Sequence, residues 1–312
     1  MTATLPRPVL LDCDPGTDDA LALWLALAAP EIDLRLVTVA GGNVGLARTL
    51  PNALALVGLA GGRVPVVAGA DRPLLGRFRD EAAVHGADGL GGVVLPPGPA
   101  ATPGLAMDAI RAALRAAAPD SVTLVGLGPA TNFALALAAE PALRDRVAEI
   151  VLMTGALGEG NWSAAAEFNA AMDPEALAIL LACGRPVTLA TLDLTAQAFV
   201  TPARIEALRA APGGACLRAA ADILASVPPS RRFGFRGVAL HDPCAVAWLL
   251  APALFTARAV AVAVVLDGPD RGRTRIDRWG RDQGAALNGR FLETLDAEGF
   301  FALLAARLGA LP

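Results

Sequence analysis

Residues Leu10–Ala20 read LLDCDPGTDDA, and this stretch decides the fold class. Its first residues belong to the short apolar run Val9–Cys13, which is typical of a buried strand. Its last residues begin Asp18–Ala28, which has helical character. The Pro15-Gly16 turn separates the two segments. A buried strand that passes through a tight turn directly into a helix predicts an α/β unit.

The same alternation of β-rich runs and helical stretches continues along the first part of the chain. The further predicted strands are Leu34–Ala40, Val64–Ala68, Val122–Gly126, Ile150–Met153 and Val187–Leu192, and the further predicted helices include Leu105–Ala117, Thr131–Ala139 and Pro174–Cys183. Continuous apolar strands separated by helices indicate a parallel sheet whose faces are both covered. We therefore predict an open, mostly parallel, Rossmann-like α/β sheet with the active site at the C-terminal ends of its strands.

The second part of the chain is more mixed, and it shows no linker or repeat. It is predicted to contain helices after Thr201, a polar segment Pro228–Gly237, a helix His241–Leu250, a strand Ala259–Leu266, a hairpin through Thr274–Trp279 and a C-terminal helix. Two loops, Pro73–Gly104 and Gly155–Asp173, are longer than a connection needs, and such loops commonly carry function. A single domain over residues 1–312 is the simplest interpretation.

Composition excludes several classes of function. The longest apolar stretches, Ala20–Pro30 and Ala259–Leu266, are shorter than the roughly 20 residues of a spanning helix, and no signal peptide is visible. A net charge of −4 without a basic run argues against a nucleic-acid partner. We expect a cytoplasmic protein without a membrane partner.

Two residue types narrow the chemistry further. All 26 basic residues are arginine, so catalysis through a lysine Schiff base or a Walker lysine is excluded. The 4 cysteines are scattered without a C-x-x-C pair, so zinc and redox roles are not expected and the cysteines are predicted to be buried as small apolar side chains.

The aspartates around the first turn point to a metal ion. Helix capping explains one of them, and Asp18 suffices for it. Capping does not explain Asp12, Asp14 and Asp19 as well, because like charges packed this closely repel unless a cation or shared protons neutralise them. With oxygen ligands and no His–Cys cluster nearby, calcium or magnesium is the natural occupant.

Two further groups of polar residues accompany the acidic turn. His241-Asp242-Pro243 stands at a predicted helix start, and histidine is scarce, since His85 and His241 are the only 2. The loop Gly158–Asn169 contains amide and carboxylate groups at Asn161, Glu167 and Asn169, with flat apolar faces at Trp162 and Phe168. This mixture suits a sugar that carries an aromatic base. The alternative is a loop with only a structural role, which caps the following helix.

Taken in order along the chain, these motifs resemble the inosine–uridine-preferring nucleoside hydrolase family over nearly the whole length. The matching segments are the DCDPGTDDA opening, Gly41-Gly42-Asn43, Gly128–Asn132, Asn161 with Glu167-Phe168-Asn169, and His241-Asp242-Pro243. The resemblance implies a calcium-dependent enzyme that cleaves the N-glycosidic bond of ribonucleosides through a metal-bound water, and an assembly that is a homodimer or homotetramer.

The resemblance also implies roles for individual residues. Calcium would be bound by Asp14, Asp19, Asp242 and the backbone carbonyl of Leu127, with Asp14 also the general base and His241 the group that protonates the departing base. The substrate would be held by Asp18, Asn43, Asn161, Glu167 and Asn169 at the ribose hydroxyls, by Phe168 beside the sugar and by His85 at the base. Family members often place tyrosine near the base, and the chain has 0 tyrosines. Phe233, Phe235 or Arg236 are the candidates to replace it.

Two other interpretations start from the same residues. In the first, Asp12 and Asp14 are the nucleophile and the acid of a haloacid-dehalogenase-like phosphatase, an arrangement that leaves Asp19 and His241-Asp242 unexplained. In the second, the protein is a metal-dependent ribonucleoside-binding protein without turnover. The presence of Asp14, Asp19 and Asp242 argues against a loss of catalytic activity.

Overall fold

A computed structural model describes residues 5–312 of the chain, and its centre is a nine-stranded sheet with the order β10-β9-β11-β6-β5-β4-β1-β2-β3. The strands are β1 (Arg7–Cys13), β2 (Ile32–Val39), β3 (Val66–Ala68), β4 (Val122–Gly126), β5 (Val147–Met153), β6 (Val187–Ala190), β9 (Phe255–Val264), β10 (Thr274–Asp277) and β11 (Gly289–Leu295). A separate small sheet pairs β7 (Phe199–Val200) with β8 (Val238–Ala239).

The sheet is parallel from β3 through β11, and its last two strands run antiparallel to their neighbours. Six strands follow the doubly wound order 3-2-1-4-5-6, in which the direction of winding reverses between β1 and β4. In open parallel sheets, ligands bind outside the carboxyl ends of the strands at this reversal. The turn after β1 is therefore placed where a ligand site is expected.

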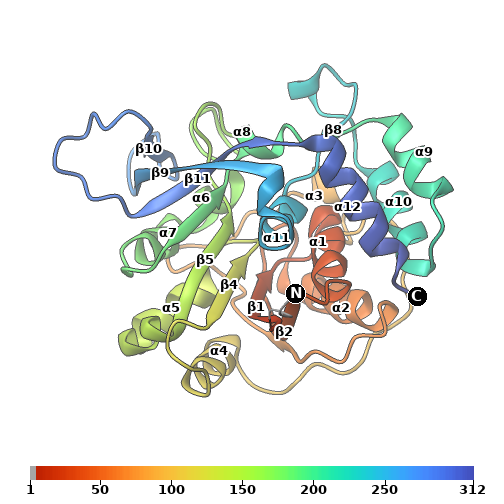
Figure 1. Ribbon diagram of the computed structural model, residues 1–312, viewed down its shortest axis with the longest axis horizontal. Coiled ribbons are helices and arrows are strands. Elements are labelled where there is room, and N and C mark those ends of the chain that lie inside the picture. The colour runs from red at the N-terminus through yellow and green to blue at the C-terminus, as the bar shows by residue number, and fades with distance from the viewer. Residues whose placement is uncertain (1–4) are drawn as a thin grey trace.

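Helices cover both faces of the sheet (Figure 1). One face carries α1 (Thr17–Leu27), α2 (Leu46–Leu59), α10 (Ala215–Ser226), α11 (Asp242–Leu250) and α12 (Ala297–Gly309); the other carries α4 (Ala106–Arg115), α5 (Thr131–Ala139) and α7 (Pro174–Leu181). Trp24 of α1 is fully buried, and its indole N–H donates to the carbonyl of Leu56 in α2 at 3.0 Å. The chain ends beside α10, since Cys216 N–H donates to the carbonyl of Pro312 at 2.9 Å.

The remaining helices are short or lie at the periphery. They are α3 (Ala82–His85), α6 (Phe168–Met172), α8 (Leu192–Thr195), α9 (Pro202–Ala210) and the 3-10 turns Pro141–Arg146, Arg231–Phe233 and Pro252–Leu254. Figure 1 shows α9, α10 and α12 at one end of the molecule and β9 and β10 at the other. Of the two long loops predicted from the sequence, Pro73–Gly104 contains α3 and Gly155–Asp173 contains α6.

The open, mostly parallel α/β sheet is confirmed, and so is the β9–β10 hairpin. The sequence interpretation did not include β11, which lies between β6 and β9 and extends the parallel sheet. Its sequence GRFLETL mixes Arg290 and Glu293 with apolar residues because one face is only partly covered. Helix α2 also escaped prediction, since Pro51 interrupts its helical pattern.

Two expectations about composition can be compared with the structure. None of the helices within residues 5–312 is long and apolar enough to span a membrane. Cys13, Cys216 and Cys244 are buried as expected, whereas Cys183 is only partly buried, and all four are free thiols. The predicted dimer or tetramer stays a prediction.

Candidate active site

The acidic turn joins the end of β1 to the start of α1 and is closed by its own side chains. Asp19 accepts hydrogen bonds from the backbone N–H groups of Asp14 at 3.1 Å and Gly16 at 3.0 Å. Asn43, which follows β2, donates its side-chain amide to Asp19 at 2.9 Å. Glycine is needed at position 16, because a Cβ there would lie 2.6 Å from Asn43 Nδ2 and 2.6 Å from His85 Nδ1.

Asp14 lies at the bottom of the site, fully buried. Its Oδ2 atom accepts the backbone N–H of Asn43 at 2.7 Å, but its Oδ1 atom is buried without a hydrogen-bond partner among residues 5–312. Backbone glycines make room for this carboxylate, since a Cβ at Gly128 would lie 2.2 Å from Oδ1. A buried carboxylate oxygen left unpaired is costly unless a proton or a cation binds it.

Asp242, the first residue of α11, joins the cluster through the packing of α11 against α1. One carboxylate oxygen from each of Asp18, Asp19 and Asp242 lies within 4.8 Å of the others. Asp14 is not a member of that set and lies beside Asp19, whose side chain binds its backbone. The predicted ligands Asp14, Asp19 and Asp242 are thus brought together, with Asp18 in addition.

The electrostatics of the cluster fit a hard cation. Burial, reinforced by neighbouring carboxylates, raises the pKa of Asp19 to about 7 and the pKa values of Asp14 and Asp242 well above their usual range. Protons would neutralise the metal-free cluster, and a divalent cation would replace them. Since every donor is an oxygen, a calcium- or magnesium-type ion fits better than zinc or copper.

A cavity of about 700 Å³ opens above the cluster. Its walls come from the carboxyl ends of the parallel strands and from the two long loops. Among its lining residues are all the predicted substrate contacts: Asp18, Asn43, His85, Asn161, Glu167, Phe168 and Asn169, together with Leu127, His241 and Asp242. The structure therefore gathers residues that lie more than 200 positions apart in the sequence.

Glu167 has a structural role as well as a place in the cavity wall. It caps α6, where its carboxylate accepts the backbone N–H groups of Asn169 at 2.7 Å and Ala170 at 3.0 Å. It also accepts the Thr154 hydroxyl at 3.1 Å and the Gly155 N–H at 2.9 Å. Burial raises the pKa of this carboxyl group, and the four hydrogen bonds oppose that shift. Its predicted ribose contact stays a prediction.

Other loop contacts position the neighbouring side chains. The side-chain amide of Asn169 donates to the carbonyl of Leu127 at 2.7 Å and to that of Met153 at 2.9 Å, which connects the ends of β4 and β5. Asn161 Oδ1 accepts the N–H of Phe168 at 2.8 Å, and the Trp162 and Phe168 rings meet edge to face at 5.7 Å. The loop before α6 is therefore folded onto the cavity wall.

Both histidines face the cavity, and each is held at Nδ1. The backbone N–H of Thr17 donates to Nδ1 of His85 at 3.0 Å, and the Thr195 hydroxyl lies 2.7 Å from Nδ1 of His241. Burial lowers the pKa of both imidazoles, and the positive charge of Arg232 adds to this effect at His241. Neither threonine was predicted from the sequence. Thr17 donates through its backbone N–H, which its residue type does not reveal, and Thr195 lies in a mainly apolar segment without a functional signal.

Of the three residues predicted to replace the tyrosine of the family that the sequence resembles, one lines the cavity. Phe233 does line the cavity and packs against Phe199 with ring centroids 5.0 Å apart. Phe235 is 66% exposed and, like Arg236, is not among the lining residues. Val227–Arg232 also line the cavity here, and Arg232 donates to the carbonyl of Glu159 at 3.3 Å.

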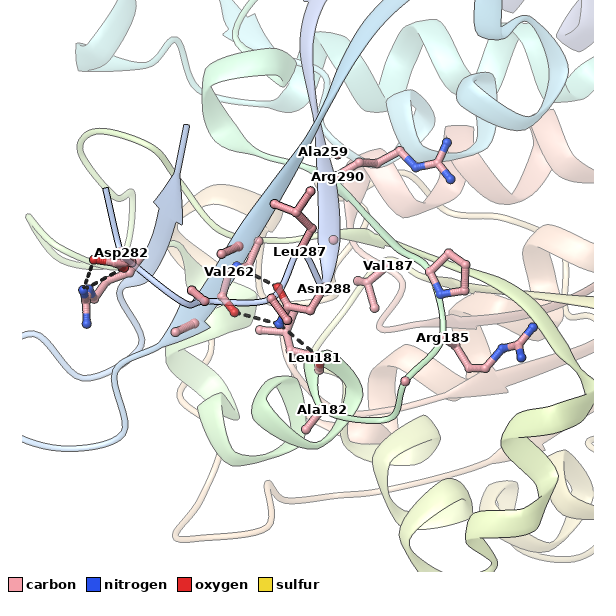
Figure 2. Close-up of a pocket in the computed structure, with 18 of the residues that line it drawn as sticks. Leu181, Ala182, Arg185, Val187, Ala259, Val262, Asp282, Leu287, Asn288 and Arg290 are labelled. Atoms are coloured by element: carbon pink, nitrogen blue, oxygen red, sulfur yellow. Dashed lines mark hydrogen bonds and ion pairs between the residues drawn. The ribbon is translucent and has the colours of Figure 1, made fainter. Parts of the chain in front are cut away.

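A second cavity of about 1000 Å³ lies at the far end of the sheet, between the start of β6 and the strands β9 and β11 (Figure 2). Its walls are mostly alanine and other apolar residues, including Val262 and Leu287. Figure 2 shows the side chains of Arg185 and Arg290 extending away from these apolar residues. It holds no group of carboxylates like that of the acidic turn, so the smaller cavity is the candidate active site.

Comparison with known proteins identifies the family. The sequence profile described as "Inosine-uridine preferring nucleoside hydrolase" matches residues 9–302. The chain belongs to this family. It is accordingly an enzyme, a hydrolase of the N-glycosidic bonds of ribonucleosides.

Individual members of the nucleoside hydrolase family are similar over almost the whole chain. The pyrimidine-specific ribonucleoside hydrolase RihA of Shewanella woodyi is 41% identical over 308 residues, covering 97% of this chain and 98% of that protein. The Klebsiella pneumoniae protein of the same name is 40% identical over 305 residues, covering 96% and 98%. The structure of a purine-preferring ribonucleoside hydrolase from Gardnerella vaginalis superposes with a TM-score of 0.87 at 32% identity, covering 97% and 98%.

Membership of the nucleoside hydrolase family and the geometry both disfavour the two alternative functions. Asp12, the phosphatase nucleophile in one of them, is 1% exposed and accepts hydrogen bonds from Thr38 and Asn132 below the cavity. Burial raises its pKa to about 7. A buried carboxylate whose oxygen is already bound by two neighbouring side chains is not placed to attack a substrate. The similar proteins are named hydrolases, which disfavours a binding protein without turnover.

Proposed function

We propose that this hydrolase is calcium-dependent and prefers pyrimidine ribonucleosides. The observation that carries the calcium dependence is the unpaired, buried Oδ1 atom of Asp14 beside the carboxylates of Asp18, Asp19 and Asp242. The support for pyrimidines is that relatives about 40% identical bear the name pyrimidine-specific, whereas the purine-preferring protein is 32% identical.

The cation would be held by oxygen atoms alone. Its proposed ligands are Asp14, Asp19, Asp242 and the carbonyl of Leu127, which is also the acceptor of Asn169. A bound calcium ion would lower the pKa of a coordinated water molecule, so that water can be deprotonated near neutral pH. Calcium accommodates a larger and less regular set of oxygens than magnesium does, which suits four ligands from three separate chain segments.

Asp14 is the proposed general base. Its Oδ2 is held by the backbone N–H of Asn43 at 2.7 Å, and Oδ1 has no hydrogen-bond partner among the described residues, so the lone pairs of Oδ1 can serve both the cation and the water. The free oxygen can accept a proton from the attacking water. Burial raises the pKa of the Asp14 carboxyl group in the metal-free protein, and a bound cation would oppose that shift, so that the carboxylate is ionised and able to accept the proton.

The ribose is proposed to lie between the acidic cluster and Phe168. Asp18, Asn43, Asn161 and Asn169 line this part of the cavity with acceptors and donors for hydroxyl groups. As the glycosidic bond breaks, the sugar acquires positive charge. The nearby carboxylates stabilise that charge, which lowers the barrier to bond cleavage.

The base is proposed to lie against His85 and His241. His85 accepts Thr17 N–H at Nδ1, so its neutral ring carries a proton at Nε2 and can donate it in a hydrogen bond. A pyrimidine has a carbonyl oxygen beside its glycosidic nitrogen, and this oxygen takes up negative charge as the base departs. His241, expected from the sequence to protonate the base, is proposed to stabilise this charge by donating a hydrogen bond to the oxygen.

Initial rates of ribose release from uridine, cytidine, inosine and adenosine, measured in calcium-containing buffer, test the base preference. The proposal predicts the higher kcat/KM values for uridine and cytidine. Higher values for inosine or adenosine would contradict it while leaving the reaction class intact.

A further inference from the structure

Thr195 and His241 form a partly buried contact that has no role in the proposed reaction as described above. Thr195 is the last residue of α8 and is fully buried, while His241 directly precedes α11 and lines the cavity. The Thr195 hydroxyl oxygen lies 2.7 Å from Nδ1 of His241. This is the length of a well-formed hydrogen bond that involves a hydroxyl group.

The surroundings of the hydroxyl determine which atom donates. Besides His241, its one other acceptor contact is the carbonyl of Leu192 at 3.5 Å, at the limit of hydrogen bonding. The short contact favours a hydroxyl proton directed at Nδ1 over one directed at the more distant carbonyl of Leu192. In a neutral imidazole, a nitrogen that accepts a hydrogen bond carries no proton, so the ring proton is on Nε2.

Both partners are held by their own backbones. Thr195 N–H donates to the carbonyl of Thr191 at 2.9 Å, and Asp193 in the same helix accepts the N–H of Leu157 at 2.6 Å. On the other side, Leu240 N–H donates to the carbonyl of Ala198 at 3.0 Å, so the residue before His241 is fixed to the segment that follows α8. The hydroxyl is thus a fixed feature of the site.

We propose that Thr195 is a positioning residue that holds His241 in the tautomer whose Nε2–H faces the departing base. The inference rests on the proposed function of His241. The base leaves with the electron pair of the glycosidic bond, and its negative charge is shared with the adjacent carbonyl oxygen. Water takes its place on the sugar carbon and gives one proton to Asp14, and the base acquires its proton from solvent. His241 Nε2–H stays bonded throughout and stabilises the departing anion by a hydrogen bond.

His85 shows the same arrangement by a different donor. Its Nδ1 accepts the backbone N–H of Thr17, which has no alternative orientation. Two imidazoles held at Nδ1 present two Nε2–H donors to one cavity, as a base with carbonyl acceptors requires. The Thr17 hydroxyl also lies 3.0 Å from this Nδ1, beside the backbone donor. The His241 contact differs because only a side chain supplies it, so substitution can remove it.

Kinetics with two substrates test the role of Thr195. Thr195→Val keeps the side-chain shape and removes the hydroxyl, whereas Thr195→Ser keeps the hydroxyl. For uridine we expect Thr195→Val to lower kcat about 10- to 100-fold with little change in KM, and Thr195→Ser to stay near the parent enzyme. For p-nitrophenyl β-D-ribofuranoside, whose leaving group departs as a stable anion, we expect Thr195→Val to change kcat by about twofold at most. Equal losses on both substrates would overturn the proposal, since they indicate a general structural effect.

The tautomer itself can be observed without substrate. The chain has 2 histidines, so a long-range ¹⁵N–¹H spectrum of the labelled protein contains two imidazole spin systems, and a His85→Asn variant assigns them. We expect the His241 ring to carry its proton on Nε2, and a mixture of tautomers to appear in Thr195→Val. A proton on Nδ1 in the parent protein would overturn the proposal. This readout is independent of turnover, so an enzyme that failed to cleave uridine would count against the proposed function and not against the Thr195 contact.

Discussion

The backbone N–H of Thr17 donates to Nδ1 of His85 at 3.0 Å, so the first turn of α1 orients a cavity histidine 68 positions away. The same turn carries Asp18 and Asp19. The start of α1 thus positions both the carboxylates of Asp18 and Asp19 and the imidazole of His85.

This contact predicts the effect of replacing His85. Loss of the Nε2–H donor should lower kcat/KM for uridine about 10- to 100-fold, the cost of one hydrogen bond to a charge-bearing acceptor. Turnover of p-nitrophenyl β-D-ribofuranoside should change much less. Thr17→Val keeps the backbone N–H and removes only the Thr17 hydroxyl, which also lies 3.0 Å from Nδ1 of His85, so it should have the smaller effect on uridine. A larger loss in Thr17→Val than in His85→Ala would contradict this account.

Gly16→Ala should inactivate the enzyme. An added Cβ would lie 2.6 Å from Asn43 Nδ2 and from His85 Nδ1, so the turn, the amide and the imidazole must all move. We expect kcat/KM to fall at least about 100-fold. Gly45→Ala, where a Cβ meets nothing within 4 Å, is the control and should retain activity. Similar rates for the two variants would show that the turn tolerates displacement.

Glu167→Gln should destabilise the protein even before activity is considered. The carboxylate accepts four hydrogen bonds, from Thr154, Gly155, Asn169 and Ala170, and an amide would turn an N–H₂ group toward some of these donors. A buried donor left facing another donor costs about 1–3 kcal/mol. Urea unfolding curves of the two proteins measure this loss. An unchanged midpoint would contradict the capping role of Glu167.

The metal-free protein should lose stability as the pH rises from about 4 to about 7, the interval between the ordinary pKa of 3.8 and the raised pKa values of Asp12 and Asp19. Both carboxyl groups have a higher pKa in the folded protein than in the unfolded chain, so the folded protein binds more protons in this interval. The stability that these protons supply is lost as they dissociate with rising pH. Calcium should restore stability most at and above pH 7, where it binds ionised carboxylates.

Thermal midpoints from pH 5 to 8, measured with a chelator and then with calcium, test this expectation. Asp12→Asn is the informative variant, because its Oδ1 can still accept from Thr38 and Asn132 while one titrating group is gone. Its midpoint should depend less steeply on pH than that of the parent. A midpoint that rises with pH in the chelator would be the opposite of the expected result.

The sequence predicted the parts of the site that are local. Asp14, Asp18 and Asp19 are neighbours in the chain, and their crowding alone indicates a cation. That Asp242 joins them depends on how α11 packs against α1, which the resemblance to a family implied and the residues alone did not. The strands β1 to β6 were visible because each contains a mainly apolar, buried run, although Arg35 in β2 and Glu149 in β5 interrupt their strands.

Long-range polar contacts were invisible for a physical reason. Thr195 lies in an apolar-looking segment, and nothing in its neighbours indicates that a histidine 46 positions away approaches it. Asn132 reaches Asp12 across 120 positions in the same way. Strand β11 was missed because the partly covered sheet face gives it charged residues that break the apolar pattern.

Release of free ribose from uridine, with and without a calcium chelator, in parallel for the parent enzyme and Asp14→Ala, tests the central claim most directly. Asp108→Ala, a change to an exposed carboxylate on α4, is the surface control. The account predicts chelator-sensitive release by the parent and the control, restored by added calcium, and release at least about 100-fold slower in Asp14→Ala. Undiminished release in the chelator, or by Asp14→Ala, would contradict a calcium site in which Asp14 is the base.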